Sequence, residues 1–404
     1  MAKATPGTIM TPVESIRRLI AFDTTSSKSN LDLIDDIADY LDGFGIDSIR
    51  VHSDDGTKAN IIAALGPKKP GGIVLSGHTD VVPVEGQVWK TDPFDLAQNN
   101  AKLYGRGTAD MKSFIATALA LVPEFLERDL HVPIYFAFSY DEEVGCLGAP
   151  RLLDRLLKDL PKPLLAIIGE PTEMKVVNTH REVRSYITHI TGKPAHSSMP
   201  ALGINAITHA AQCIGFLKDL ALEMSRRSKA PEGAAESEPQ NPAYTTINIG
   251  QIEGGTATNI IAEHCQFHWD CRSLPDEDPE EAPNRLNEFV KSEILPRMKT
   301  GAGENDPQIS ITTVQHHRVP PLIPQSGSPA EAIVLALTGQ NRCVSAPFAT
   351  EAGQFQESGI PAVVCGPGSA AQAHQPNEFI EVTQVEACVD FLRKVADWAA
   401  DQPA

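Results

Sequence analysis

The seven cysteines of this chain show no C-x-x-C spacing, and their number is odd. A disulfide framework needs paired cysteines, so this pattern argues against a small disulfide-stabilised secreted domain. We interpret the cysteines as reduced thiols of a cytoplasmic protein. Cys146 follows a run of acidic residues, and we interpret it as a small buried residue rather than a reactive thiol.

Long apolar runs are also lacking. No stretch approaches the roughly 18 residues that a membrane span needs. The first residues, MAKATPGTIM, contain no apolar h-region of the kind found in secretory signals. We therefore expect a cytoplasmic location and no membrane partner.

Basic residues are scarce: 34 Lys and Arg stand against 52 Asp and Glu, which gives a net charge of −18. No Lys/Arg cluster is visible, and this argues against DNA, RNA or anionic membranes as partners. A cationic substrate would be attracted, although an acidic surface also serves solubility. The hydrophobic content of 42% and the charged content of 21% are ordinary for a globular protein.

Several catalytic motifs are missing. No Gly-x-Ser-x-Gly elbow occurs, which argues against a serine hydrolase of that type. There is no Walker A loop, and Gly105-Arg106-Gly107 lacks the third glycine of a dinucleotide fingerprint. Nucleotide chemistry is therefore not expected.

The most informative stretch that is present runs from Ile134 to Gly145 and reads IYFAFSYDEEVG. Its first half has the composition of a strand buried on both faces of a parallel sheet. Asp141, Glu142 and Glu143 follow at once. Ligands collect beyond the carboxyl ends of strands in open α/β sheets, and adjacent carboxylates repel unless a cation lies among them. The alternative is that these acids cap the next helix.

At 404 residues the chain is long enough for two domains. Apolar runs and helical periods alternate up to about residue 181 and again after residue 319, which predicts a doubly wound α/β layer structure. Helices are expected at 11–22, 30–44, 114–127, 149–157, 329–337 and 383–400, and strands at 60–65, 72–75, 134–140, 164–168 and 362–365.

The middle of the chain has a different texture. Strands at 184–191, 245–253, 263–272 and 308–315 and helices at 204–224 and 279–298 give a β-α-β-β-α-β order, and a polar loop is expected at 229–242. This order is the ferredoxin-like split βαβ motif. We predict a discontinuous catalytic domain, 1–181 and 319–404, with an inserted α+β ferredoxin-like domain at 182–318.

Candidate metal ligands share one position in the pattern, the loop after a short apolar strand. Because such loops converge at one sheet edge, two imidazoles and three carboxylates there would suit a pair of divalent ions. Each residue alone also has an ordinary explanation, a hydrogen-bonded histidine or a solvated acid. The residues are His78 with Asp80, Asp110, Glu142 with Glu143, Glu170, and His374.

Asp80 lies two residues after His78 and is placed to hold its imidazole by a hydrogen bond. His316-His317 is a superficially similar pair, but neighbouring side chains of a strand point to opposite faces, so we discount it.

Seven strings, in this order and spacing, resemble the M20 family of dinuclear zinc amidohydrolases from about residue 10 onward. Within that family the resemblance is closest to enzymes that deacetylate N2-acetyl-L-ornithine in arginine biosynthesis, notably in the Thr350-Glu351-Ala352 segment. The strings are SGHTDVVP (76–83), GRGTADMK (105–112), YDEEVG (140–145), GEPT (169–172), AHSS (195–198), GGTATNIIAE (254–263) and GPGSAAQAHQPNEFI (366–380).

The resemblance implies a zinc-peptidase-like catalytic domain and two metal ions, with Zn²⁺ favoured and Co²⁺ an alternative. Asp110 would bridge the ions, His78 and Glu170 would complete one site, and Glu143 and His374 the other. Glu142 would be the general base and acid. This assignment agrees with metal-assisted hydrolysis, in which a carboxylate moves the proton.

The resemblance further implies a homodimer formed through the inserted domain, which would also act as a lid. His196 would stabilise the tetrahedral intermediate in the partner's active site, and Asn259 and Arg272 would hold substrate, since the Arg fork suits a carboxylate. Thr350 and Glu351 are further substrate-binding candidates, with Glu351 facing a cationic ornithine side chain or only solvent.

Two alternatives stay open at this level. One is another acylase of the same family, acting on N-acyl amino acids, succinyl-diaminopimelate or dipeptides. The other is a non-catalytic metal-binding homodimer, which would have lost the base; the presence of Glu142 weighs against it.

Overall fold

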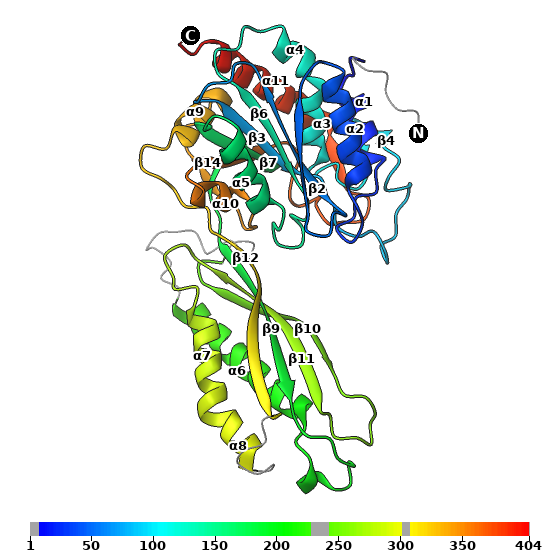
Figure 1. Cartoon of the computed structure of the whole chain (residues 1–404), viewed down its shortest axis with the longest axis vertical. Helices are drawn as coiled ribbons and strands as arrows, with labels where there is room; N and C mark the ends of the chain where they lie inside the picture. The colour runs from blue at the N-terminus through cyan, green and yellow to red at the C-terminus, as the bar shows by residue number, and fades with distance from the viewer. Residues whose placement is uncertain (1–7, 228–241, 301–307, 404) are drawn as a thin grey trace. The chain divides into compact units, whose positions relative to one another are not determined.

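The structure is a computed structural model that describes residues 8–227, 242–300 and 308–403. The chain divides into two compact units. The larger unit comprises Met1–His180 and Leu322–Ala404, and the inserted unit comprises Arg181–Pro321 (Figure 1). The polar loop expected at 229–242 lies, apart from Pro242, outside the described residues.

Within the described residues, the larger unit is built on an eight-stranded sheet in the order β1-β2-β6-β3-β7-β14-β8-β13. Strands β6, β3, β7 and β14 run parallel, whereas β2 is antiparallel to both β1 and β6. The parallel environment expected around residues 134–140 is therefore correct on one side of that strand and wrong on the other. The strands are β1 (Ser48–His52), β2 (Ala59–Leu65), β3 (Ile73–His78), β6 (Ile134–Ser139), β7 (Leu165–Pro171), β8 (Val177–Thr179), β13 (Val344–Ser345) and β14 (Ala362–Gly366).

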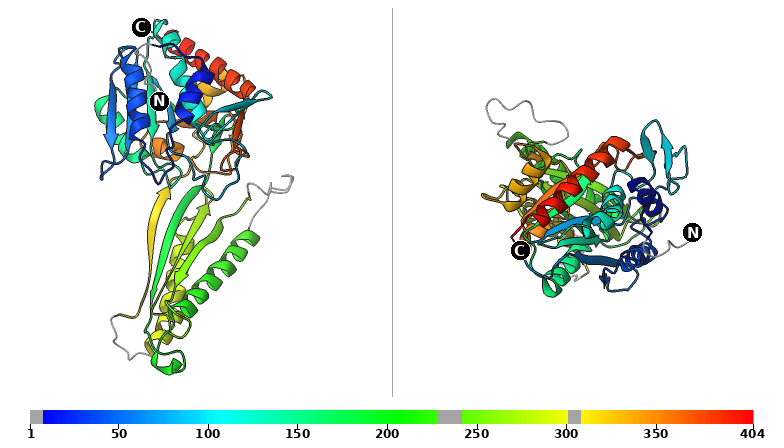
Figure 2. Two further views of the ribbon diagram at one scale, coloured as in Figure 1. Left: turned by 90° about the vertical axis from the view of Figure 1, so that its right-hand side faces the viewer. Right: turned by 90° about the horizontal axis from the view of Figure 1, so that it is seen from above.

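Helices pack on both faces of this sheet, as Figures 1 and 2 show. On β6, Phe136 and Phe138 join one apolar core, and Tyr135 and Ala137 join the other. A strand with apolar side chains on both faces needs a helical layer on each, and this confirms the predicted doubly wound α/β class. The first layer consists of α1 (Pro12–Ile20), α2 (Leu31–Asp42), α3 (Lys112–Ala120), α4 (Val122–Leu126), α9 (Pro329–Thr338) and α11 (Val382–Ala400), and the second of α5 (Ala149–Asp159) and α10 (Ala352–Glu357).

The expected helix start at Thr11 is present as a capping box. The Thr11 hydroxyl accepts the Glu14 N–H at 3.3 Å, and the Thr11 N–H donates to the Glu14 carboxylate at 2.7 Å. Two of the free N–H groups at the helix start are thereby satisfied.

A small sheet at the edge of the larger unit was not predicted. It pairs β4 (Ala97–Asn99), β5 (Lys102–Tyr104) and β15 (Phe379–Glu381) in the order β15-β5-β4. Phe379 lies opposite Tyr104. This register brings the chain just before β15 next to the chain just after β5, although the two are far apart in sequence.

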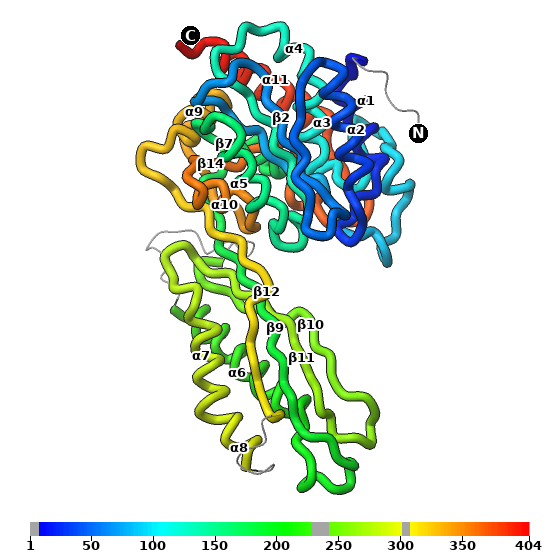
Figure 3. The backbone as a smooth tube through the Cα atoms, in the orientation of Figure 1, coloured from blue at the N-terminus to red at the C-terminus, as the bar shows by residue number. Residues whose placement is uncertain are grey.

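The inserted unit has four antiparallel strands in the order β10-β11-β9-β12. Its helices cover one face of the sheet (Figure 3). The core between the helices and the sheet includes Phe267, Trp269 and Leu217. The order along the chain is β-α-β-β-α-β, the split motif that the sequence indicated. The elements are β9 (Glu182–Thr191), a 3₁₀ turn (Pro200–Leu202), α6 (Ala206–Arg227), β10 (Thr246–Gly254), β11 (His264–Ser273), α7 (Glu281–Phe289), a π-helical turn (Val290–Ile294), α8 (Leu295–Thr300) and β12 (Ser310–Val319).

Among the described residues, no helix combines the length and the apolar character needed to cross a bilayer.

Candidate metal centre

Five side chains from separate parts of the larger unit come together beyond the ends of its parallel strands. We call them the ligand set: His78, Asp110, Glu143, Glu170 and His374. His78 ends β3, Glu170 lies near the end of β7, and Glu143 follows β6. Parallel strands deliver such residues to one edge of a sheet, which is why residues distant in sequence meet here.

The ligand set forms two groups that share Asp110. In the first group, His78 Nε2 lies 2.9 Å from Asp110 Oδ1 and 3.6 Å from Glu170 Oε1. In the second, His374 Nε2 lies 3.3 Å from Asp110 Oδ2 and 3.0 Å from Glu143 Oε2. Within each group, one ligand atom per residue lies within 4.8 Å of the others. Asp110 thus offers one carboxylate oxygen to each group.

The electrostatics of this cluster favour a bound cation. Burial raises the pKa of Glu143 to about 7, and burial together with the charge of Asp110 raises the pKa of Glu170 well above its ordinary value. Hydrogen bonds with Asp110 and Glu143 raise the pKa of His374 to about 10. All three shifts report excess negative charge in a partly buried place.

Two buried carboxylate oxygens of the ligand set, Glu143 Oε1 and Glu170 Oε1, have no hydrogen-bond partner within the described residues. A buried oxygen without a partner is costly, and a divalent cation supplies such a partner. Nitrogen and oxygen donors of this kind suit Zn²⁺ and neighbouring transition metals. The residues present therefore fit a metal ion in each group.

A hydrogen bond to the ring nitrogen that faces away from the other ligands fixes the orientation of His78. Its Nδ1–H donates to the backbone carbonyl of Asp80 at 2.9 Å, which leaves Nε2 directed at the ligand set. The Asp80 carboxylate is farther from the ring, with Oδ1 at 3.6 Å from Nδ1. That carboxylate accepts the backbone N–H groups of Glu142 and Glu143 at 3.1 and 3.2 Å. Asp80 thus holds both the imidazole and the acidic loop, through different atoms.

Glu142 lies beside the ligand set without belonging to either group. Its Oε1 accepts a hydrogen bond from the Cys146 thiol at 3.4 Å, and Cys146 is buried, as expected. Burial raises the pKa of Glu142 to about 8. A carboxyl group whose pKa lies near neutrality is suited to accept a proton and return it.

Thr350 and Glu351, predicted to contact substrate, lie in the interior. Glu351 is 1% exposed, and its two carboxylate oxygens accept the hydroxyls of Ser76 at 2.5 Å and Ser139 at 2.7 Å. The Thr350 hydroxyl lies 3.3 Å from His180 Nε2. Because both Glu351 oxygens are occupied and enclosed, the predicted contact with a cationic substrate side chain does not fit this placement.

The three candidates of the inserted unit are exposed. His196 and Asn259 lie on adjoining loops: His196 Nδ1 is 2.7 Å from the Ser198 hydroxyl, and the Ser197 N–H donates to the Asn259 carbonyl at 3.0 Å. Arg272 lies near the other end of β11, with Nε 3.2 Å from Asp270.

The strand register separates these candidates. On β11, Arg272 pairs with Val183 at the start of β9, whereas His264 pairs with Thr191 at its end, and His196 follows Thr191. Eight residues of strand span about 26 Å. Arg272 therefore lies far from His196 and Asn259 within the inserted unit.

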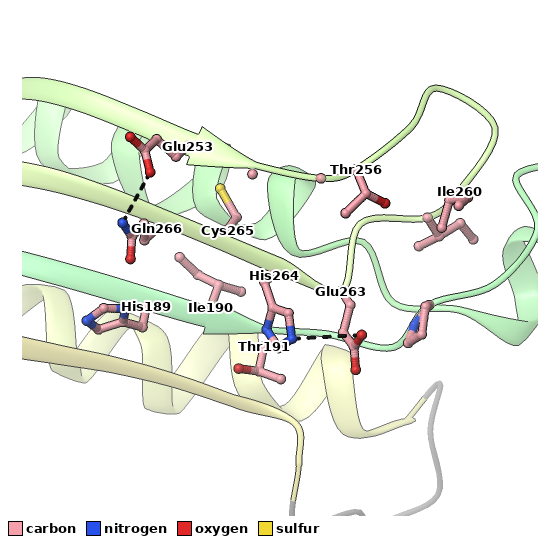
Figure 4. Close-up of a pocket in the computed structure, with 14 residues that line it drawn as sticks. His189, Ile190, Thr191, Glu253, Thr256, Ile260, Glu263, His264, Cys265 and Gln266 are labelled. Atoms are coloured by element: carbon pink, nitrogen blue, oxygen red, sulfur yellow. Dashed lines mark hydrogen bonds and ion pairs between the residues drawn. The ribbon is translucent and has the colours of Figure 1, made fainter.

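A pocket of about 450 Å³ lies at the end of the inserted sheet near Ile260. Figure 4 shows Glu253 paired with Gln266 and Glu263 paired with His264 at its wall. None of the ligand set lines it. All the residues that line the pocket belong to the inserted unit.

Sequence reasoning missed a buried ion pair, Arg106 with Glu378, that supports the ligand set. Both residues lie in strings that carried the family resemblance, and this was the available signal. Neither string indicates by itself that the two side chains meet.

Comparison with known proteins gives consistent results. Residues 74–398 match the model of peptidase family M20/M25/M40. An acetylornithine deacetylase from Pasteurella multocida is 34% identical over 384 residues, which cover 93% of this chain and 95% of that protein. Another from Shigella sonnei is 33% identical over 394 residues, with coverages of 95% and 96%. The crystal structure of an M20 family metallo-carboxypeptidase from Sulfolobus solfataricus covers 97% of this chain and 100% of its own, with a TM-score of 0.73 at 16% identity, and supports the fold.

Proposed function

We propose that this chain, which belongs to peptidase family M20/M25/M40 and is a metal-dependent hydrolase, deacetylates N2-acetyl-L-ornithine to L-ornithine and acetate. The observation that carries the proposal is the pair of ligand groups that share Asp110, with Glu142 beside them. Acetylornithine deacetylases at 33–34% identity over nearly the whole chain support the choice of substrate. The reaction would belong to arginine biosynthesis.

The ligand set would hold two divalent ions, with Zn²⁺ favoured and Co²⁺ an alternative. When bound, such ions polarise an amide carbonyl and lower the pKa of a water molecule. Asp110, which belongs to both ligand groups, would help to hold both ions.

Glu142 would carry the proton. Its carboxylate accepts a proton from the attacking water as the water oxygen bonds to the acetyl carbon. The same proton then passes to the amide nitrogen as the C–N bond breaks. Glu142 next takes up the proton of the new carboxyl group and passes it to the amine, so that acetate and the ammonium form of ornithine leave. Asp80 keeps Glu142 in place through the backbone N–H at 3.1 Å.

His196 would donate a hydrogen bond to the oxyanion that forms on the acetyl group, and Arg272 and Asn259 would bind the rest of the substrate. Arg272 lies at one end of β11, and His196 lies in a loop beyond the other end, too far from Arg272 for both to touch one small substrate within a single inserted unit. Asn259 lies on the loop next to His196 and is equally far from Arg272. A homodimer formed through the inserted unit resolves this, because each active site would then receive His196 together with Asn259 from the partner subunit.

We also propose a cytoplasmic location. All seven cysteines lie in the described residues, and none of them forms a disulfide there. Reduced thiols are the usual state in the cytosol.

A substrate panel tests the proposal. Release of the acyl group would be measured for N2-acetyl-L-ornithine, N-acetyl-L-methionine, N-succinyl-diaminopimelate and a dipeptide, with and without a chelator. The highest kcat/KM is expected for acetylornithine, with loss of activity on chelation and recovery with Zn²⁺ or Co²⁺. A preference for a substrate with a neutral side chain would redirect the proposal to another acylase, and inactivity with the metals bound would favour a non-catalytic protein.

A further inference from the structure

Arg106 and Glu378 form an ion pair in the interior of the larger unit. Arg106 Nη1 lies 2.6 Å from Glu378 Oε2, and the two side chains are 1% and 0% exposed. Burying two charges costs several kcal/mol each unless good geometry and further hydrogen bonds compensate. A pair buried this completely is weak support for stability alone, so its other contacts indicate what it does.

The Glu378 carboxylate accepts three backbone N–H groups from one loop. Oε2 accepts Gly107 N–H at 3.1 Å, and Oε1 accepts Ala109 N–H at 2.7 Å and Asp110 N–H at 3.1 Å. The loop is therefore wrapped around this one carboxylate. Asp110, the residue shared by the two ligand groups, is its last member.

Gly107 makes this wrapping possible. Its φ is +86°, a conformation that side chains disfavour, and a Cβ there would approach Val81 to 2.9 Å and Lys112 to 3.1 Å. The loop thus needs glycine to turn its N–H groups toward Glu378.

Arg106 connects the same carboxylate to the other ligand loop. Its Nη2 donates to Gln87 Oε1 at 2.7 Å, and Gln87 Nε2 donates to the His374 carbonyl at 3.1 Å. The Arg106 guanidinium also lies over the Trp89 ring, 5.1 Å from its centroid. A chain of hydrogen bonds therefore runs from the Asp110 backbone to the His374 backbone.

The small sheet fixes both ends of this arrangement. Glu378 directly precedes β15 and Gly105 directly follows β5, and the Gly105 N–H donates to the Glu378 carbonyl at 3.0 Å. The ladder between β5 and β15 thus brings the two loops to a fixed separation before any metal binds.

We propose that Glu378 and Arg106 are positioning residues that set the spacing of Asp110 and His374, and so the affinity of the metal group formed by Asp110, Glu143 and His374. This inference rests on the proposed metal centre. Gln87 acts with them as the link to His374. None of the three touches substrate or the reacting atoms, so their effect passes through the ligand loops.

The test is Co²⁺ titration of metal-free protein, followed by calorimetry and by the absorption spectrum of bound Co²⁺. In Glu378→Gln, the side-chain NH₂ must face either Arg106 or backbone N–H groups, so at least one donor loses its acceptor. We expect the Co²⁺ site that contains His374 to lose about 10- to 100-fold in affinity, the usual effect of disturbing residues that hydrogen-bond to metal ligands. The spectrum should change, while KM of residual activity stays near the wild-type value.

Asp36→Asn is the matched control. Arg18 and Asp36 form a part-buried pair with Nε–Oδ2 at 2.7 Å, between α1 and α2. This variant should lower the melting temperature of the metal-free protein as Glu378→Gln does, with Co²⁺ affinity unchanged. Equal loss of Co²⁺ affinity in both variants would overturn the proposal, since general destabilisation would then explain it.

Gln87→Ala guards against a Glu378 variant that does not fold. Gln87 is only partly buried, so this change should leave folding intact and weaken Co²⁺ binding at the site containing His374 by a few-fold. Gln98→Ala, an exposed change in β4, is the control and should leave Co²⁺ affinity unchanged. The proposal is overturned if folded Glu378→Gln binds Co²⁺ within twofold of the wild-type affinity. If Glu378→Gln does not fold, the same result in Gln87→Ala overturns it. Failure of the wild-type chain to bind two Co²⁺ would instead overturn the proposed metal centre.

Discussion

The two units hold their functional candidates in different ways. In the larger unit, the ligand set is fixed by hydrogen bonds from behind, such as the Asp80 carbonyl on His78 and the Glu378 carboxylate on the Asp110 loop. In the inserted unit, His196 and Arg272 are exposed and lie toward opposite ends of the sheet. The ligand set is complete within one unit, whereas His196 and Arg272 can act only when a partner subunit or a substrate contacts them.

This difference indicates which changes should be severe and which should be graded. Residues that are preorganised around the reacting atoms contribute to the chemical step itself. An exposed residue that acts in the partner's active site, as we propose for His196, affects kcat only in the assembled dimer, and an intact partner subunit can restore its function. An exposed residue that binds substrate, as we propose for Arg272, mainly affects KM.

The largest effect is expected for Glu142→Ala. Removing the proton carrier should lower kcat by about 10²- to 10⁴-fold, the range for general acid–base groups. Metal content should stay unchanged, because Glu142 belongs to neither ligand group. Glu143→Ala is the contrasting variant and should lose bound metal, as measured by elemental analysis. Equal metal loss in both variants would remove the distinction between base and ligand.

His196→Ala should come next, with kcat lowered by about 10²- to 10³-fold through loss of one oxyanion donor. Mixing it with Glu142→Ala tests whether the residue acts in the partner subunit. A randomly exchanged dimer would then carry an intact site in half of its molecules and recover about a quarter of wild-type activity. No recovery after verified subunit exchange would place His196 in its own subunit's site or in none.

Arg272→Ala should mainly raise KM, by about 10- to 100-fold, because a charge-assisted hydrogen bond to the substrate carboxylate is worth about 1.5–3 kcal/mol. Arg272→Lys should recover only part of this, since an ammonium lacks the planar fork. Steady-state kinetics with acetylornithine provide the measurement. A pure kcat effect in both variants would contradict a binding role.

The smallest effect on catalysis is expected for Glu351→Ala. It should destabilise the protein by about 1–3 kcal/mol for each buried donor left without an acceptor, here the hydroxyls of Ser76 and Ser139. The ratio of kcat/KM for acetylornithine over N-acetylmethionine should not change. A selective loss of acetylornithine turnover would restore the contact with substrate that the sequence suggested.

Sequence patterns located the long, fully buried elements well. Residues 134–139 and 165–168 are apolar enough to be read as strands, and the polar residues that follow them include Glu142 and two members of the ligand set, Glu143 and Glu170. The strand expected at 72–75 continues to His78, because Ser76 pairs with both β6 and β7 and the next two residues still pair with β6. Neighbouring strands, not composition, determine where it ends.

Contacts between distant segments could not be predicted in the same way. Strand β13 has only two residues, and β5 becomes a strand through its pairing with β15. Glu351 looks like a loop acid in sequence, and only the serines of β3 and β6 show why it is buried. The burial of Glu378 and Arg106 could not be predicted for the same reason, because only their contact with each other shows why two charged side chains are buried.

The most direct measurement is an anomalous difference map at the zinc edge, from crystals grown with Zn²⁺. We expect two peaks per chain roughly 3.5–4 Å apart, one contacted by His78 and Glu170, the other by Glu143 and His374, with Asp110 between them. A single peak, or peaks away from these residues, would contradict this expectation.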